Sequence, residues 1–167
     1  MSKFSTRQLT TLAALVAIEI VLSRFLSINA WNTKIGFSFV PIVVAAILYG
    51  PIQAAVVGAL GDFIGAILFP IGAYFPGFTF TAFLTGLVFG FFLHKEQTVL
   101  RTVCAVLIVQ FILGLLLNTC WISVLYSSPY VPLLATRLFQ ACLLTVVQIV
   151  TTLALARALP RIKKALI

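Results

Sequence analysis

Long apolar runs, separated by short segments that hold almost all of the charge, constrain this chain more than any other feature. Eleven Lys and Arg residues and three Asp and Glu residues are the only charged ones among 167. Most of the cations lie at the two termini and in the segment from His94 to Arg101. The apolar runs between them are long enough to cross a bilayer, which takes about 20 residues as a helix. The chain is therefore predicted to be an all-α integral membrane protein with several spans.

Composition excludes most other classes of protein. A mean hydropathy of +1.21 and 15 Phe residues lie far outside the range of water-soluble domains. The net charge of +8 is compatible with nucleic-acid binding, but the cations flank the apolar runs, which favours membrane orientation and no nucleic-acid partner. Cys104, Cys120 and Cys142 stand singly in apolar segments, which is typical of small buried residues rather than of a metal site or a disulfide.

Six spans fit the chain, which is predicted to form a single transmembrane domain over residues 1–167. Gly50-Pro51 marks a tight break between the second and third spans. The second and fourth spans are short, at about 15 residues, so tilting or kinking is expected there. The predicted spans cover residues 8–28, 36–49, 52–69, 79–93, 102–126 and 133–159.

The distribution of Lys and Arg predicts that both termini lie in the cytoplasm. With six spans, the opposite side carries Lys34 in its first loop, with Arg24 and Arg137 embedded near the outer ends of their helices. Short cytoplasmic loops carry the excess of Lys and Arg, so the richer side is the inner one. The cations on the side of the N-terminus are Lys3, Arg7, Lys95, Arg101, Arg157, Arg161, Lys163 and Lys164.

The predicted outer loops are rich in aromatic residues, whereas the inner loops hold almost no Trp or Tyr beyond Tyr49. One interpretation is the aromatic belt that membrane proteins place at both interfaces. The bias towards one face favours the other, an aromatic-lined pocket that opens outwards. The aromatic residues on this side include Trp31, Tyr74, Phe75, Phe78, Tyr126 and Tyr130.

Polar residues inside the spans mark either helix packing or function. Asp62 shares a helical face with Ala54, Gly58, Gly61 and Gly65, which predicts a tight helix contact with the carboxyl group buried near the membrane middle. A structural role for Asp62, capping a backbone or pairing with a cation, is as plausible as a functional one. Ala82, Gly86 and Gly90 form a similar small-residue stripe on the fourth span.

The last two spans carry further polar stripes, with Gln110, Gly114, Asn118 and Trp121 on one helix and Arg137, Gln140 and Gln148 on the other. Arg24 and Arg137 either snorkel to lipid headgroups or contact a ligand. Cations among aromatics would suit a flat, anionic, heteroaromatic ligand, with its rings stacked and its acceptors held by guanidinium groups. The predicted binding residues are Arg24, Trp31, Lys34, Phe37, Tyr74, Phe75, Phe78, Asn118, Trp121, Arg137 and Gln140.

Several motifs are missing from the sequence. It has no phosphate-binding loop of the GxxxxGK[ST] type, no HExxH or other metal cluster, and no Ser/His/Asp arrangement. An enzyme is therefore disfavoured, and no cofactor is expected. The chain is predicted to bind a solute from outside and to leave energisation to partners. The alternative is a self-sufficient secondary carrier or facilitator.

The run GALGDFIGAILFPIGAYFPGFTFTAFLTGLVFGFFL, Gly58 to Leu93, resembles the substrate-binding S components of energy-coupling factor (ECF) vitamin transporters. The preceding run KIGFSFVPIVVAAILYGPIQAAVVGALGD, Lys34 to Asp62, is most similar to the folate-specific subfamily; an S component for another vitamin is the alternative. The resemblance covers nearly the whole chain. It implies a six-helix fold in the bacterial cytoplasmic membrane, an outward-facing vitamin pocket, and a complex with a transmembrane coupling subunit and two ATPase subunits. It also implies that the protein topples to carry vitamin inwards.

The resemblance also implies a docking site on the first helix, where Ala13 and Ala17 match the family's Ala-x-x-x-Ala motif. Alanines four residues apart permit close helix approach without polar cost. Arg24 lies seven residues beyond Ala17 and falls on nearly the same helical face. The docking stripe and the pocket cation are therefore expected to use opposite ends of the helix.

Overall fold

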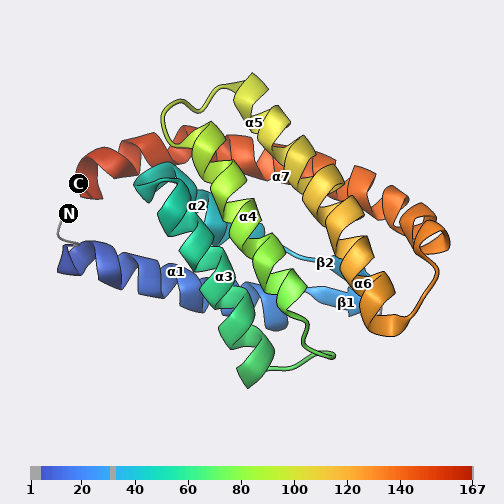
Figure 1. The fold of residues 1–167 in the computed structure, drawn as a ribbon. Coiled ribbons are helices and arrows are strands. Elements are labelled where there is room, and N and C mark those ends of the chain that lie inside the picture. The colour runs from blue at the N-terminus through green and yellow to red at the C-terminus, as the bar shows by residue number, and fades with distance from the viewer. Residues whose placement is uncertain (1–4, 31–32, 167) are drawn as a thin grey trace.

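The structure is a computed structural model that describes residues 5–30 and 33–166. It is a bundle of helices with one short antiparallel hairpin, in which β1 pairs with β2 through Asn29 and Lys34. Figure 1 places the start of the first helix and the end of the last on the same side of the bundle. The elements are α1 (Thr6–Arg24), β1 (Ile28–Ala30), β2 (Thr33–Ile35), α2 (Phe39–Tyr49), α3 (Pro51–Leu68), α4 (Pro76–Leu93), α5 (Val99–Leu107), η1 (Ile108–Leu117), α6 (Asn118–Tyr126) and α7 (Tyr130–Leu166).

The all-helical membrane fold is confirmed, with six helical bodies where six spans are predicted. Within the described residues, five of them are long and apolar enough to cross a bilayer: α1, α3, α4, the continuous α5–η1–α6 and α7. The sixth, α2, has 11 residues and is almost entirely buried. An apolar helix of that length is typical of a core helix rather than a full span. Which side of the membrane the termini face stays a prediction.

The break between α2 and α3 has the local structure that Gly50-Pro51 predicts. Gly50 has a φ of 101°, a backbone conformation that side chains other than glycine rarely adopt. Pro51 occupies the first turn of α3, where a missing N–H costs nothing. The chain therefore reverses in one residue and packs α2 against α3.

Helices α3 and α4 pack almost backbone to backbone, which makes each the partner that the other's small-residue stripe left unnamed. A Cβ added at Gly58 would lie 2.6 Å from the carbonyl oxygen of Ala82. One added at Gly86 would overlap the backbone of Ala54, and one at Gly90 would overlap Pro51. Small residues on both helices therefore set the spacing between them.

The fifth helical body is not a uniform α-helix. Its central ten residues, η1, have the wider π-helical hydrogen bonding, between the α-helical segments α5 and α6. The sequence predicts a plain helix here. Wide turns of this kind are rare and occur frequently at functional sites.

Candidate functional site

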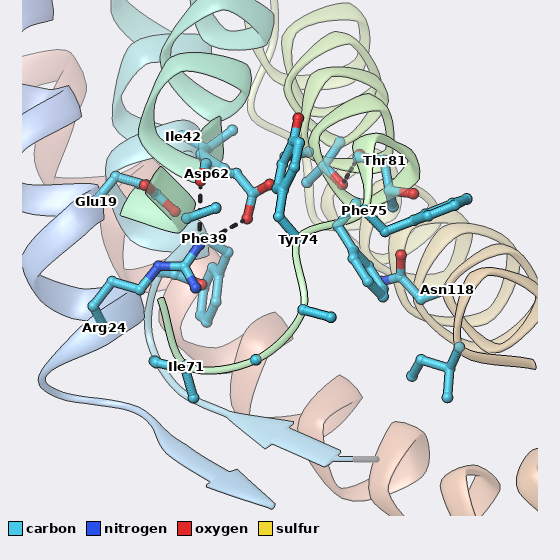
Figure 2. A pocket seen from close by; sticks show the side chains of 18 of the residues that line it. Glu19, Arg24, Phe39, Ile42, Asp62, Ile71, Tyr74, Phe75, Thr81 and Asn118 are labelled. Carbon is cyan, nitrogen blue, oxygen red and sulfur yellow. Dashed lines mark hydrogen bonds and ion pairs between the residues drawn. The ribbon is translucent and has the colours of Figure 1, made fainter. Parts of the chain in front are cut away.

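A cavity of about 470 Å³ lies at the end of the bundle opposite the start of α1 and the end of α7. Its walls come from the second half of α1, the start of α2, the second half of α3, the loop from Pro70 to Phe75, the first half of α4, η1, α6 and the first half of α7. This end is the predicted extracellular one. Figure 2 shows side chains from these different elements pointing into a common space. Cavities of 300–1,000 Å³ are the usual size for small-molecule sites.

An ion pair stands on one wall of the cavity. The Arg24 guanidinium donates from Nη2 to Oδ1 of Asp62 at 3.4 Å and to the backbone oxygen of Asp62 at 3.1 Å. Asp62 also accepts a hydrogen bond from Oγ1 of Thr79 at 2.8 Å. The three residues belong to α1, α3 and α4, so this network ties three helices together beside the cavity. Figure 2 shows the Arg24–Asp62 pair within it.

A second carboxylate lies close to the pair. Glu19, five residues before Arg24 on α1, is buried and lines the cavity. A Cβ added at Gly61 would overlap its carboxylate, so α1 and α3 approach closely at this glycine. The chain has only three acidic residues, and two of them line this cavity. The site therefore offers acceptors as well as cationic donors.

Aromatic rings form the opposite wall. Phe75 packs against Trp121 with ring centroids 5.6 Å apart and edge-on against Phe78 at 6.2 Å. Trp121 is fixed in turn, because its Nε1 donates to Oγ1 of Thr81 at 3.1 Å. On the loop, the ring of Tyr74 meets Phe63 edge-on. Such a wall presents ring faces and edges on which a flat ligand can stack.

A second, smaller cavity of about 200 Å³ adjoins the first, between η1–α6 and α7. Asn118, Arg137 and Gln148 line both cavities. Gln110 donates from Nε2 to Oε1 of Gln148 at 2.6 Å, which joins η1 to α7. Gln140 lines the second cavity but not the first. The polar stripes that the sequence places on these two helices thus face each other.

The structure brings together most of the predicted binding residues. Trp121 packs behind Phe75, whereas Phe37 is exposed, stacks near Phe39 and lies outside both cavity linings as the structure describes them. Trp31 lies outside the described residues, and so does the side chain of Lys34, although its backbone forms part of β2. The predicted residues that line a cavity are Arg24, Tyr74, Phe75, Phe78, Asn118, Arg137 and Gln140.

Sequence reasoning missed the two carboxylates as cavity residues. Asp62 was expected to be buried at a helix contact near the membrane middle, but it is only partly buried, in the second half of α3, and lines the cavity. The reason is that the glycines of α3 divide between two neighbours: Gly58 faces α4, while Gly61 and Gly65 face α1. Asp62, between these two contacts, is left at the cavity. The scarcity of acids in the chain was the one signal that pointed to Glu19 and Asp62.

The predicted docking residues lie away from the cavity. Ala13 and Ala17 are both exposed on α1, whereas Arg24 at the end of the helix reaches over Gly65 of α3. A Cβ at Gly65 would lie 2.8 Å from Nε of Arg24. The alanines and the arginine thus use opposite ends of α1.

The chain is similar to a family of membrane transport proteins. Residues 3–161 match the family described as ECF-type riboflavin transporter, S component. A folate transporter FolT from Clostridium novyi (strain NT) is 39% identical over 134 residues, which are 80% of this chain and 78% of that protein. A folate transporter FolT from Leuconostoc mesenteroides subsp. mesenteroides is 35% identical over 130 residues, 77% of this chain and 70% of that one. The crystal structure of FolT bound with folic acid superposes with a TM-score of 0.88 at 31% identity, covering 93% of this chain and 97% of that one.

Proposed function

The chain belongs to the S-component family of ECF-type transporters, multi-pass membrane proteins of solute transport, and from this premise we propose that it binds folate. The cavity carries this proposal: one wall presents aromatic rings with the amide of Asn118 beside them, and the opposite wall presents the guanidinium and carboxylate groups of Arg24 and Asp62 (Figure 2). Folate is a flat two-ring heterocycle joined to a benzoyl ring and an anionic glutamate. A site with both ring faces and hydrogen-bonding groups matches that chemistry.

The proposed site comprises the predicted residues on the cavity walls together with Trp31 and Lys34. Phe75 and Phe78, backed by Trp121, stack on the ligand, while Arg24 and Arg137 supply hydrogen-bond donors. Trp31 and Lys34 belong to the segment that directly follows Arg24 and remain predictions for the mouth of the site. The ligand enters from the extracellular side, since the cavity lies at the end predicted to face outwards.

Titration calorimetry of the purified chain in detergent tests the proposal. Folic acid is expected to bind with one site per chain, and Arg24→Ala and Arg137→Ala are each expected to lose about ten- to hundredfold in affinity. Arg101→Ala is the matched control, because Arg101 pairs with Glu96 on the surface at the other end of the bundle. Absence of folic acid binding to the parent chain would sink the proposal. If Arg24→Ala and Arg137→Ala both bound folic acid as tightly as the parent chain, the two arginines would not belong to the binding site.

Riboflavin is a second candidate, favoured by the description of the matching family. It too is a flat heteroaromatic molecule, but its ribityl tail is uncharged. Competition between the two vitamins on the same protein decides between them. Displacement of bound folic acid by excess riboflavin, with riboflavin the tighter ligand, would reverse the assignment.

We also propose that the chain works in a complex with a transmembrane coupling subunit and two ATPase subunits, which release the bound vitamin inside. Membership in the S-component family supports this, because such components are the substrate-binding part of an importer. The exposed alanines of α1 supply the docking stripe. The alternative, a self-sufficient carrier, predicts uptake that needs no partner and no ATP.

A further inference from the structure

The end of the bundle away from the cavity carries most of the cations that the proposed site does not use. This basic end is formed by the start of α1, the loop from His94 to Thr98, the start of α5 and the end of α7 (Figure 1). Arg7, Lys95 and Arg157 are exposed there, and Arg101 is partly exposed. The last turns of α7 hold a further three cationic residues, Arg161, Lys163 and Lys164.

The chain itself hardly neutralises this charge. Two of its three acidic residues line the cavity, so Glu96 is the one acid at the basic end. Oε2 of Glu96 pairs with Nη2 of Arg101 at 3.1 Å. Arg7, Lys95 and Arg157 form no ion pair with an acidic side chain in the described part of the chain. The negative charge that balances them therefore comes from outside the protein.

Uncovered apolar side chains flank the same cations. Phe91 in the last turn of α4 is 70% exposed, and Val99 and Leu100 in the first turn of α5 are 55% and 74% exposed. The loop between them carries Lys95. Such a surface suits the boundary between lipid headgroups and acyl chains, where basic side chains lay their stems along hydrocarbon and reach the phosphates. A soluble acidic protein or a free anion would leave the apolar side chains against water.

The length of α7 brings its cations to the same boundary. Its 37 residues span about 55 Å, whereas the hydrocarbon core of a bilayer is about 30 Å thick. Arg157 lies about 40 Å along the helix from Tyr130, at the depth of headgroups rather than of acyl chains. The helix is still packed on the bundle at this point, because Leu159 is buried in the same apolar core as Leu93 of α4. Arg157 is therefore held at the membrane surface.

We propose that the basic end binds the headgroups of anionic phospholipids. Lys95 and Arg157 contact lipid phosphates, and Val99 and Leu100 lie among the first carbons of the acyl chains. Several cations next to an anionic leaflet add their attractions, so the end as a whole selects anionic over zwitterionic lipid. This binding fixes the basic end at one leaflet while the cavity opens at the other. The alternative is that the cations only orient the chain during insertion, which requires no lipid preference of the folded protein.

Native mass spectrometry of the full chain, released from detergent micelles, provides the test. The chain is titrated with dioleoyl-phosphatidylglycerol and, separately, with dioleoyl-phosphatidylcholine, which share their acyl chains and differ in headgroup charge. We expect the parent to bind the anionic lipid about tenfold more tightly, and Lys95→Gln and Arg157→Gln each to reduce this preference about two- to fivefold. Glu96→Gln should raise the preference, because it frees Arg101. Equal affinity of the parent for both lipids would overturn the proposal and leave the cations a role in orientation alone.

Lys34→Gln is the matched control, since it removes one positive charge from the hairpin at the other end of the bundle and should keep the parent's preference. Arg157→Lys keeps the charge, should also keep the preference, and covers the case in which Arg157→Gln does not fold. A preference unchanged in both Lys95→Gln and Arg157→Gln would overturn the assignment to the basic end. Ammonium phosphate at the same concentration should not displace phosphatidylglycerol; displacement would make this a site for free anions and overturn the proposal as well.

Discussion

At the scale of single residues, the network around Asp62 determines how much of the site is formed before a ligand arrives. Its carboxylate accepts from Arg24 on α1 and from Thr79 on α4, so one side chain holds two others in position. The side chains of the ion pair are 12% and 18% exposed, which shields them from water and salt. Arg24 is therefore already held at the cavity wall before a ligand binds.

Replacing Asp62 by Asn should weaken both the fold and the site. The change keeps the shape of the side chain but removes the charge that pairs with the largely buried Arg24, which we expect to cost about 1–3 kcal/mol of stability. Thermal unfolding of the purified variant in detergent, with and without folic acid, measures both effects. Glu96→Gln is the control: the Arg101–Glu96 pair is 41% and 66% exposed, and such pairs contribute at most about 1 kcal/mol. An Asp62→Asn melting temperature equal to the parent's would show that the pair has no structural role.

The residues predicted from sequence are those that stand out chemically against an apolar chain. Arg24, Arg137 and the aromatic residues of the loop after α3 do so, and the structure places them on common walls. Glu19 was missed because its role depends on how α1 is rotated against α3. Apolar periodicity does not fix that rotation in a membrane, since the lipid-facing and buried faces of a helix are equally apolar. The pairing of Asp62 with a cation was one of two open interpretations, and only the helix arrangement decides between them.

At the scale of elements, the small residues in the sequence predict close contacts between helices, whereas the hydrogen-bond pattern within a helix cannot be predicted from the sequence. The stripes on α3 and α4 predict close helix contacts without naming the partner helix, and in the structure Gly58, Gly86 and Gly90 lie where these two helices meet. The π-helical turns of η1 leave no compositional trace, since they differ from α-helix only in which carbonyl each N–H reaches. The hairpin between α1 and α2 was expected only as a loop, because its strands have three residues each.

The α3–α4 contact can be tested with one matched pair of substitutions. Gly86→Ala places a methyl group against the backbone of Ala54, which cannot move aside as a side chain would. We expect a loss of about 1–3 kcal/mol, large enough to exceed the gain of up to about 1 kcal/mol that Ala brings to a helix. At Gly72, in the loop, an added Cβ would meet only Oη of Tyr126 at 3.4 Å, so Gly72→Ala should stay within about 0.5 kcal/mol. Chemical or thermal unfolding in detergent compares the two, and equal stability would refute the close contact.

At the scale of the whole molecule, α1 connects two proposed functions at opposite ends. Ala17→Trp or Ala13→Trp should abolish uptake by the assembled importer while leaving folic acid binding to the isolated chain intact. Bulk at a close helix contact would separate this chain from its partner, and the cavity lies at the other end. Ala14→Trp is the control, because Ala14 is also exposed but lies off the stripe. Loss of binding in the isolated Ala17→Trp chain would contradict the separation of the docking stripe from the cavity.

The last prediction concerns what the chain does without partners: it should bind folate but not concentrate it. Uphill transport by a single chain needs a group that couples solute movement to an ion gradient, and the sequence offered Asp62 as the isolated candidate. In the structure that carboxylate is engaged by Arg24 and Thr79, which leaves it a positioning role rather than that of a free ion-binding group. A ligand held tightly also leaves slowly, so release inside requires a conformational change driven from elsewhere. Proteoliposomes that contain only this chain should show saturable folic acid binding with no accumulation under a proton or sodium gradient. Addition of the coupling subunit, the ATPases and ATP should then start uptake, whereas accumulation driven by an ion gradient alone would make the chain a secondary carrier.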